Sequence, residues 1–269
     1  MNICFIGGGN MATALIGGLL GQGFAASQIS VVEINAENRA RLQGEFAVRA
    51  VESLAEGVAG SQVILFAVKP QQLREVAQQL APLLGRQLLI SIAAGIRAVD
   101  LARWSGSQSV VRCMPNTPAL IQSGMTGLYA LPAVSGAQRE QAQAILAAVG
   151  ETLWLQDEAM LDAVTAISGS GPAYVFYMIE ALQQAAVELG FTDEEARRLS
   201  VATFLGGSKL AAASDEEVAV LRARVTSKNG TTERALLSLA EHQVAEHIVQ
   251  AAFAAAARSR EMGDELGRA

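Results

Sequence analysis

Cysteine and histidine are scarce in this sequence, and their scarcity narrows the chemistry that the protein can perform. The 269-residue chain has two cysteines and two histidines. Cys4 and Cys113 lie in separate apolar runs, which favours buried thiols over a disulfide or a reactive nucleophile. His242 and His247 are five positions apart, a spacing that does not place two side chains on one face of a helix. We therefore expect no metal site and no catalysis by histidine.

Long apolar runs and an excess of positive charge are absent as well. No apolar run reaches the roughly 18 residues that a membrane-spanning helix needs. The first basic residue is Arg39, whereas a secretory signal begins with basic residues. The formal net charge of −6 argues against nucleic acid as a partner, and the hydrophobic content of 51% supports a sizeable core in one large domain or two smaller ones. We expect a cytoplasmic protein that binds neither nucleic acid nor membranes.

A glycine-rich turn near the N-terminus is the most informative feature that is present. An apolar run at residues 3–6 is followed by three glycines and then by a helical pattern. Gly7 permits a tight turn, Gly9 lets the backbone approach a pyrophosphate, and Ala12 keeps the helix close to the strand. The N–H groups at the start of that helix complement phosphate groups. The arrangement predicts a dinucleotide site, with a plain glycine-rich turn as the alternative, and the expected contacts are Ile6, Gly7, Gly8, Gly9, Asn10 and Met11.

Strands and helices alternate through the first part of the chain, which predicts a largely parallel sheet. We expect strands at residues 29–34, 63–68, 88–93 and 110–114, shorter ones near 128–129 and 153–155, and helices at 36–46 and 71–84. From about Asp157 the pattern becomes helical, with helices expected at residues 172–189, 193–213, 231–241 and 244–262. We predict an α/β Rossmann-like domain over residues 1–156, followed by an all-α domain over residues 157–269. Residues 251–257 are apolar on every side of a helix, so we expect this domain to form a subunit interface.

Three of the expected strand ends carry residues suited to a cofactor cleft, because ligands of parallel sheets bind beyond the carboxyl ends of the strands. They supply one cation, one amide and stretches of open backbone. A solvated lysine and a turn-forming asparagine are the alternatives for Lys69 and Asn116. The cofactor-binding candidates at these ends are Ala67, Val68, Lys69, Pro70, Ala93, Ala94, Gly95 and Asn116.

An acidic residue follows the second expected strand. Glu33 lies 24 positions after Gly9, and an acidic residue about 20 positions past the glycine turn hydrogen-bonds the ribose 2′-OH of NAD. Glu33 should disfavour the 2′-phosphate of NADPH, whereas Arg39 could swing onto that phosphate. We expect both NADH and NADPH to serve as cofactor.

Hydroxyl groups gather at a loop in the helical part. Ser227, Gly230, Thr231 and Thr232 precede or open a helix, with Glu233 in its first turn. Ordinary capping, with Gly230 as N-cap and Glu233 at the third helical position, is one interpretation. Capping needs a single hydroxyl, however, and several N–H and O–H donors at a helix N-terminus form a good carboxylate site.

Taken together, these motifs resemble pyrroline-5-carboxylate reductase over essentially the whole chain. The residues that carry the resemblance are the glycine turn, residues 68–71, 91–95, 114–118 and 168–174, and the loop 225–232. The resemblance implies reduction of 1-pyrroline-5-carboxylate to L-proline by NADPH or NADH, the last step of proline synthesis. It also implies a homodimer with intertwined helical domains, often assembled into larger rings, and a site built from two subunits.

The resemblance also implies roles for individual residues. Thr232 would hydrogen-bond the ring nitrogen of the substrate and Lys69 would line the cofactor cleft, which makes these two the catalytic candidates. The substrate-binding candidates are Ser227, Gly230, Thr231, Thr232 and Glu158. The lack of a catalytic histidine is consistent with this reaction, because a protonated cyclic imine is already electrophilic and mainly has to be held against the cofactor.

The sequence departs from the family pattern at two places, and two other functions remain open. Lys228 stands where the family often has proline, and Ser53 and Leu54 stand where it often has a cofactor-contacting asparagine. A hydroxy-acid dehydrogenase would use a lysine of the helical domain near the substrate carbonyl, for which Lys228 is the candidate. A dinucleotide sensor without catalysis would need no second substrate pocket, so the hydroxyl-rich loop argues against it.

Overall fold

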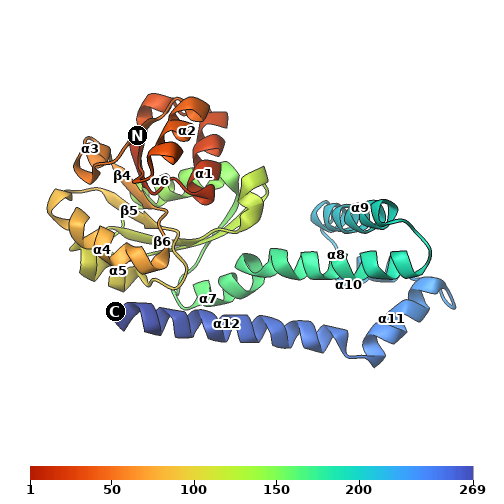
Figure 1. The fold of residues 1–269 in the computed structure, drawn as a ribbon. Coiled ribbons are helices and arrows are strands. Elements are labelled where there is room, and N and C mark those ends of the chain that lie inside the picture. Colours follow the sequence, from red (N-terminus) through yellow and green to blue (C-terminus); the bar gives the residue numbers. More distant parts are fainter. Residues whose placement is uncertain (269) are drawn as a thin grey trace. The chain divides into compact units, whose positions relative to one another are not determined.

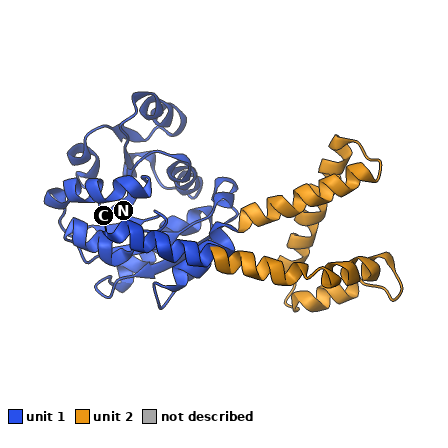
Figure 2. Ribbon diagram, turned by 60° about the horizontal axis from the view of Figure 1, so that its bottom comes forward, with its two compact units in different colours: residues 1–170, 255–269 blue, residues 171–254 orange. Residues whose placement is uncertain are grey.

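The structure, a computed structural model, describes residues 1–268 and forms two compact units. The first unit contains residues 1–170 together with the segment from residue 255 onward, and the second contains residues 171–254 (Figure 2). Among residues 1–268, none of the helices combines the length and apolarity that a membrane span requires.

The first unit is built on an eight-stranded sheet with the order β3-β2-β1-β4-β5-β6-β7-β8. Figure 1 labels three of its strands, β4, β5 and β6. All neighbouring strands are parallel except β6 and β7, which are antiparallel. The strand order reverses beside β1, which pairs with β2 on one side and β4 on the other. The strands are β1 (Ile3–Ile6), β2 (Ile29–Val32), β3 (Arg49–Val51), β4 (Val63–Phe66), β5 (Leu88–Ser91), β6 (Val110–Met114), β7 (Gly124–Ala130) and β8 (Gly150–Trp154). The predicted Rossmann-like, mostly parallel sheet is therefore confirmed.

Helices cover both faces of the sheet, because side chains alternate between the two faces along each strand. In β1, Phe5 belongs to the buried cluster that contains Leu15 of α1. Its neighbour Cys4 belongs to the other cluster, with Leu73 of α4 and Leu101 of α5. The helices of this sandwich are α1 (Asn10–Gly21), α2 (Ala36–Phe46), α3 (Leu54–Val58), α4 (Pro70–Leu80), α5 (Ala98–Ser105) and α6 (Gly136–Leu146), with short 3₁₀ turns at Ala26–Gln28, Ala81–Leu83, Thr117–Ile121 and Ala147–Val149.

The second unit is helical, as predicted, but it has almost no interior of its own. It contains α8 (Gly171–Glu188), α9 (Asp193–Ala212), α10 (Val218–Arg224), α11 (Thr231–Glu241) and the first part of α12 (Val244–Arg268). Only Ala196 and Ser200 are buried among its residues. Large apolar side chains are exposed instead, including Phe176 at 61%, Phe253 at 71% and Leu189 at 81%.

The contacts of the folded chain place the boundary between the two units later in the chain than the sequence pattern does. The sequence places the boundary near Gln156, where strand signals stop, whereas the first unit continues to Ser170. The added residues form α7 (Met160–Val164) and a π-helical turn (Thr165–Gly169). They belong to the first unit because α7 packs on the sheet, where a Cβ on Gly127 of β7 would lie 3.0 Å from Val164.

Candidate active site

The glycine turn joins β1 to α1 in the geometry that a dinucleotide requires. Gly7 has φ +98°, and a Cβ there would lie 2.8 Å from the carbonyl oxygen of Ala67. Gly9 is the N-cap of α1, and no side chain caps that helix. A Cβ on Gly9 would meet no atom within 4 Å. The start of α1 therefore has no capping side chain and open space at Gly9, and these residues fit the pyrophosphate of a dinucleotide cofactor.

A cavity of about 520 Å³ lies at the ends of β1, β2 and β4. This is where ligands of open parallel sheets bind. Of the predicted cofactor residues, the lining includes Ile6, Gly7, Gly8, Gly9, Glu33, Ala67, Val68 and Lys69. Asn10, Met11, Pro70, Ala93, Ala94, Gly95 and Asn116 lie outside the lining, and their contact with cofactor stays a prediction.

The carboxylate of Glu33 is held on the glycine turn by three hydrogen bonds. Its Oε2 accepts from Gly8 N at 3.0 Å and from Asn38 Nδ2 at 2.9 Å, and its Oε1 accepts from Asn35 N at 2.9 Å. Partial burial raises the pKa of this carboxyl, but the hydrogen bonds outweigh that effect, so the pKa lies below its ordinary value. Glu33 is consequently a fixed anion at neutral pH.

The guanidinium of Arg39 is already engaged by its own surroundings. Its Nη1 donates to the carbonyl oxygens of Glu33 at 2.7 Å and Ile34 at 2.9 Å, and its Nη2 pairs with Glu52 at 3.0 Å. Three acidic residues line the cavity, namely Glu33, Glu52 and Glu75, and Lys69 is the only basic residue of the lining. This end of the cavity is therefore acidic, and Arg39 would have to leave three acceptors to reach a phosphate.

The segments that follow β4 and β5 in the chain have different surroundings. Lys69 is the exposed N-cap of α4, and Pro70 occupies the first helical position, as is favoured there. Gly95 has φ +74°, and a Cβ on it would lie 3.1 Å from Leu266 Cδ1 and 3.2 Å from Met262 Cβ. The loop after β5 is thus covered by the C-terminal part of α12, which the sequence did not reveal.

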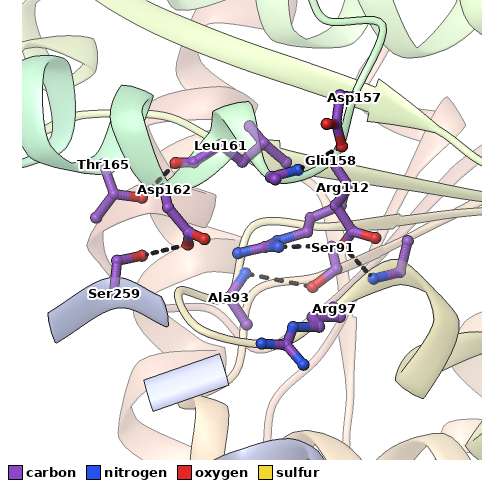
Figure 3. A network of polar contacts seen from close by, with 12 residues as sticks. Ser91, Ala93, Arg97, Arg112, Asp157, Glu158, Leu161, Asp162, Thr165 and Ser259 are labelled. Atoms are coloured by element: carbon purple, nitrogen blue, oxygen red, sulfur yellow. Dashed lines mark hydrogen bonds and ion pairs between the residues drawn. The ribbon is translucent and has the colours of Figure 1, made fainter. Parts of the chain in front are cut away.

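Glu158, a predicted substrate-binding residue, lies in a polar network of the first unit (Figure 3). Its Oε1 pairs with Arg112 Nη1 at 3.0 Å and accepts from Ala98 N, at the start of α5, at 2.6 Å. The side chains of Arg112 and Glu158 are only 7% and 17% exposed. The structure therefore gives this carboxylate two partners within the chain, and its contact with substrate stays a prediction.

Polar contacts beside this network connect α12 to α5 and α7. Ser259 Oγ donates to Asp162 Oδ1 at 2.7 Å, and Arg97 Nη2 pairs with Asp264 at 2.6 Å. Arg103 Nη2 donates to the carbonyl oxygen of Gly267 at 2.8 Å. Hydrogen bonds and ion pairs thus attach residues 259–267 to α5 and α7, beside the loop after β5.

Asn116 joins the end of β6 to the π-helical turn. Its Nδ2 donates to the carbonyl oxygen of Ser168 at 3.2 Å and to Ser168 Oγ at 3.1 Å, and its Oδ1 accepts from Met125 N at 2.9 Å. A Cβ on Gly169 would lie 2.7 Å from Met114 Cε. Asn116 therefore orders its own surroundings, which is more than the turn-forming alternative requires, and its contact with cofactor stays a prediction.

The hydroxyl-rich loop of the second unit leads into α11. Gly230 is the N-cap of α11, as the capping interpretation predicts, and no side chain caps it. Glu233 Oε2 accepts from Asn229 N at 2.6 Å instead of from the N-cap residue. Within residues 1–268, no hydrogen bond engages the hydroxyls of Ser227, Thr231 or Thr232. The donors of this loop remain available for a ligand.

Both parts of the chain match protein-family models. Residues 158–262 match the family described as pyrroline-5-carboxylate reductase dimerisation, and residues 2–95 match the family described as NADP oxidoreductase coenzyme F420-dependent.

Several pyrroline-5-carboxylate reductases match along nearly the whole chain. The sequence is 52% identical to a pyrroline-5-carboxylate reductase of Pseudomonas aeruginosa, over 99% of this chain and 98% of that protein. It is 44% identical to one from Haemophilus influenzae, over 97% of both chains. Among solved structures, a pyrroline-5-carboxylate reductase from Coxiella burnetii superposes with a TM-score of 0.93 at 37% identity, covering 97% of this chain and 98% of that one. The Plasmodium falciparum enzyme with NADP bound superposes with a TM-score of 0.87 at 28% identity, covering 98% of both.

Proposed function

Because the chain belongs to the pyrroline-5-carboxylate reductase family, we propose that it transfers a hydride from NADH or NADPH to the C=N bond of 1-pyrroline-5-carboxylate. The product is L-proline, and the reaction is the final step of proline biosynthesis. The observation that supports this most directly is the presence, in one chain, of a dinucleotide turn and of a second loop rich in free donors.

The first unit carries the cofactor in this proposal. The bound nicotinamide supplies the hydride, and the chain supplies position and charge. The N–H groups at the start of α1 hold the pyrophosphate, Glu33 accepts from the adenosine ribose, and Lys69 lines the cleft at the end of β4. These assignments rest on the fit between the cavity lining and a dinucleotide.

The loop before α11 carries the substrate. The hydroxyls of Ser227 and Thr231 and the first N–H groups of α11 hold the carboxylate, since a helix N-terminus without a cap favours an anion. The Thr232 hydroxyl hydrogen-bonds the ring nitrogen and so orients the C=N bond. No strong acid is required, because the protonated imine is already electrophilic and correct orientation supplies much of the rate.

The helical unit makes the functional protein a homo-oligomer. Its match to a dimerisation family and its exposed apolar side chains support burial against a second copy of the chain. The hydroxyl of Tyr174 is buried without a hydrogen-bond partner among residues 1–268, and a partner subunit would supply one. We expect a homodimer that can assemble into a larger ring. A cytoplasmic location and the absence of nucleic-acid and membrane partners stay predictions.

The test is oxidation of NADH and of NADPH by the purified protein with 1-pyrroline-5-carboxylate, compared with a panel of keto acids. We expect turnover with the imine and none with keto acids, and proline as the product by amino-acid analysis. Turnover of keto acids without turnover of the imine would favour a hydroxy-acid dehydrogenase. Lys228 would then be the candidate for the lysine near the substrate carbonyl. Cofactor binding without turnover of any substrate would favour a sensor.

A further inference from the structure

We propose that Asn38 is a positioning residue for cofactor choice: it holds the Glu33 carboxylate on the glycine turn, and the pair makes the chain prefer NADH to NADPH. This inference rests on the proposed function only in naming a dinucleotide as the ligand. Asn38 lies in the third position of α2, after its N-cap Asn35, and no motif in the sequence singles it out.

The side-chain amide of Asn38 bridges the two parts of the cofactor site. Its Nδ2 donates both to the carbonyl oxygen of Gly8, at 3.0 Å, and to Glu33 Oε2, at 2.9 Å. Its Oδ1 accepts from Arg41 Nε at 3.0 Å and from Arg41 Nη2 at 2.9 Å. Because two acceptors face one end of the amide and a guanidinium faces the other, the orientation of the amide is determined by its partners.

The backbone around Asn38 is itself fixed. Asn38 N donates to Asn35 Oδ1 at 2.8 Å, which caps α2. A Cβ on Gly8 would lie 3.1 Å from Asn38 Nδ2, 3.2 Å from Glu33 Oε2 and 2.5 Å from Leu42 Cδ1. A side chain at Gly8 would therefore crowd the amide and the carboxylate, and glycine leaves room for both on the turn.

A fixed carboxylate acts differently on the two cofactors. It can accept from a ribose 2′-OH, whereas a 2′-phosphate at the same place meets like-charge repulsion that a free side chain would relieve by rotating away. Rotation of Glu33 would break the hydrogen bonds from Gly8, Asn35 and Asn38. We therefore expect the wild-type protein to prefer NADH by about tenfold or more in kcat/KM, after screening by salt.

The nearby cations do not offset this repulsion. Arg39 is bound to two carbonyl oxygens and to Glu52. Arg41 is bound to Asn38, to Thr13 Oγ1 at 3.1 Å and to Glu45 at 2.8 Å. Each guanidinium would have to give up several partners in order to bind a phosphate.

The experiment compares NADH with NADPH in the full-length protein. The variants are Asn38→Ala, Asn38→Leu, Glu33→Gln and the double variant Asn38→Ala with Glu33→Gln. For each, kcat/KM is measured for both cofactors at saturating 1-pyrroline-5-carboxylate, and Kd is measured for both by fluorescence titration without substrate. The matched control is Gln43→Ala, which removes a side-chain amide of the same helix that donates to the carbonyl oxygen of Ala50 at 3.0 Å and does not touch Glu33.

The informative quantity is the ratio of kcat/KM with NADPH to kcat/KM with NADH, because damage to the fold lowers both kcat/KM values together. We expect the ratio to rise about tenfold in Glu33→Gln and about three- to tenfold in both Asn38 variants. The ratio in the double variant should equal that of Glu33→Gln alone, because Asn38 acts through Glu33, and Gln43→Ala should leave the ratio unchanged.

Three outcomes would overturn the proposal. They are a wild-type preference for NADPH, an unchanged ratio in both Asn38 variants, and additive effects in the double variant. The Kd ratios do not depend on turnover, so they test this inference even if the imine is not a substrate. Failure of imine reduction with the expected Kd shifts would refute the proposed function alone.

Discussion

Replacing Glu158 decides whether this carboxylate serves the fold or the substrate. Glu158 Oε1 pairs with Arg112 at 3.0 Å and accepts from Ala98 N at 2.6 Å. Glu158→Ala removes both interactions and leaves Arg112, whose side chain is only 7% exposed, without its partner. Glu158→Gln removes the charge but keeps an oxygen that can accept from Ala98 N. The two variants therefore separate the ion pair from the hydrogen bond at the start of α5.

The magnitude follows from the geometry and the exposure of the pair. At 3.0 Å and an effective dielectric near 20, the Coulomb attraction is about 5.5 kcal/mol, and desolvation offsets much of it. Removing one partner of a buried pair costs about 3–5 kcal/mol. Because Glu158 is 17% exposed and water can reach the site, we expect about 3 kcal/mol for Glu158→Ala. For Glu158→Gln we expect about 1–2 kcal/mol, since one hydrogen bond is retained.

Thermal unfolding at one fixed protein concentration measures this effect, because oligomers unfold at concentration-dependent temperatures. At roughly 2–4 °C per kcal/mol, Tm should fall by about 6–12 °C in Glu158→Ala. The control is Glu261→Gln, which breaks an exposed ion pair with Arg258 and should change Tm little. Below the transition, a KM for the imine near the wild-type value would assign Glu158 to the fold alone. An unchanged Tm with a tenfold or greater rise in KM would refute this reasoning and assign Glu158 to substrate binding.

Three further predictions concern the substrate loop, the assembly and the thiols. Thr232→Ala should lower kcat/KM for the imine roughly ten- to a hundredfold, because a hydrogen bond to a charged group contributes about 1.5–3 kcal/mol. Its Kd for NADH should not change, and an unchanged kcat/KM would show that the hydroxyl only belongs to the helix start. Analytical ultracentrifugation should find a dimer or larger species down to nanomolar concentration, and a folded, active monomer there would contradict the assembly. Burial raises the pKa of the Cys4 thiol to about 11 and also raises the pKa of Cys113, so the folded state favours the neutral thiols. The stability that the two buried neutral thiols contribute is complete at a pH below about 8.5, the pKa of a cysteine in the unfolded chain. It declines as the pH rises toward 11. The urea midpoint should therefore fall more steeply from pH 8.5 to 10.5 in the wild type than in a variant with both cysteines replaced by alanine, and equal slopes would contradict this.

The parts of the fold that the sequence predicts are those encoded locally. The glycine turn and the buried runs at β4 and β5 are recognisable because each needs only neighbouring residues to define it. Several of the elements that were missed are short, such as β3 with three residues and α5 with eight, but α6 with 11 residues was missed as well. The antiparallel β7 has a local cause that was overlooked. Only residues 115–123 connect it to β6, which is too few for a parallel crossover of a dozen or more residues.

The interactions within the candidate site are harder to predict, because they join residues that are distant in the sequence. Arg112 and Glu158 are 46 positions apart, and nothing in either segment indicates the other. Glu33 was identified from its spacing, but its hydrogen bonds to Gly8 and Asn38 depend on how closely α2 packs against the glycine turn. Arg39 looked free to bind a phosphate, and only the folded structure shows its three acceptors. Residue type and spacing suggest roles, whereas the folded contacts decide which groups are free.

The attachment of residues 259–267 to α5 and α7 has a consequence for the order in which the chain folds during synthesis. Ribosomes make proteins from the N-terminus at about 5–20 residues per second, and domains generally fold as they emerge. Here the residues that cover the loop after β5 are translated only after the whole helical unit of residues 171–254. The loop that ends at Gly95 therefore stays uncovered by Met262 and Leu266 while more than half of the chain is still being made. A nascent chain stalled before residue 255 would hold a largely folded sheet whose loop after β5 lacks the cover that α12 provides.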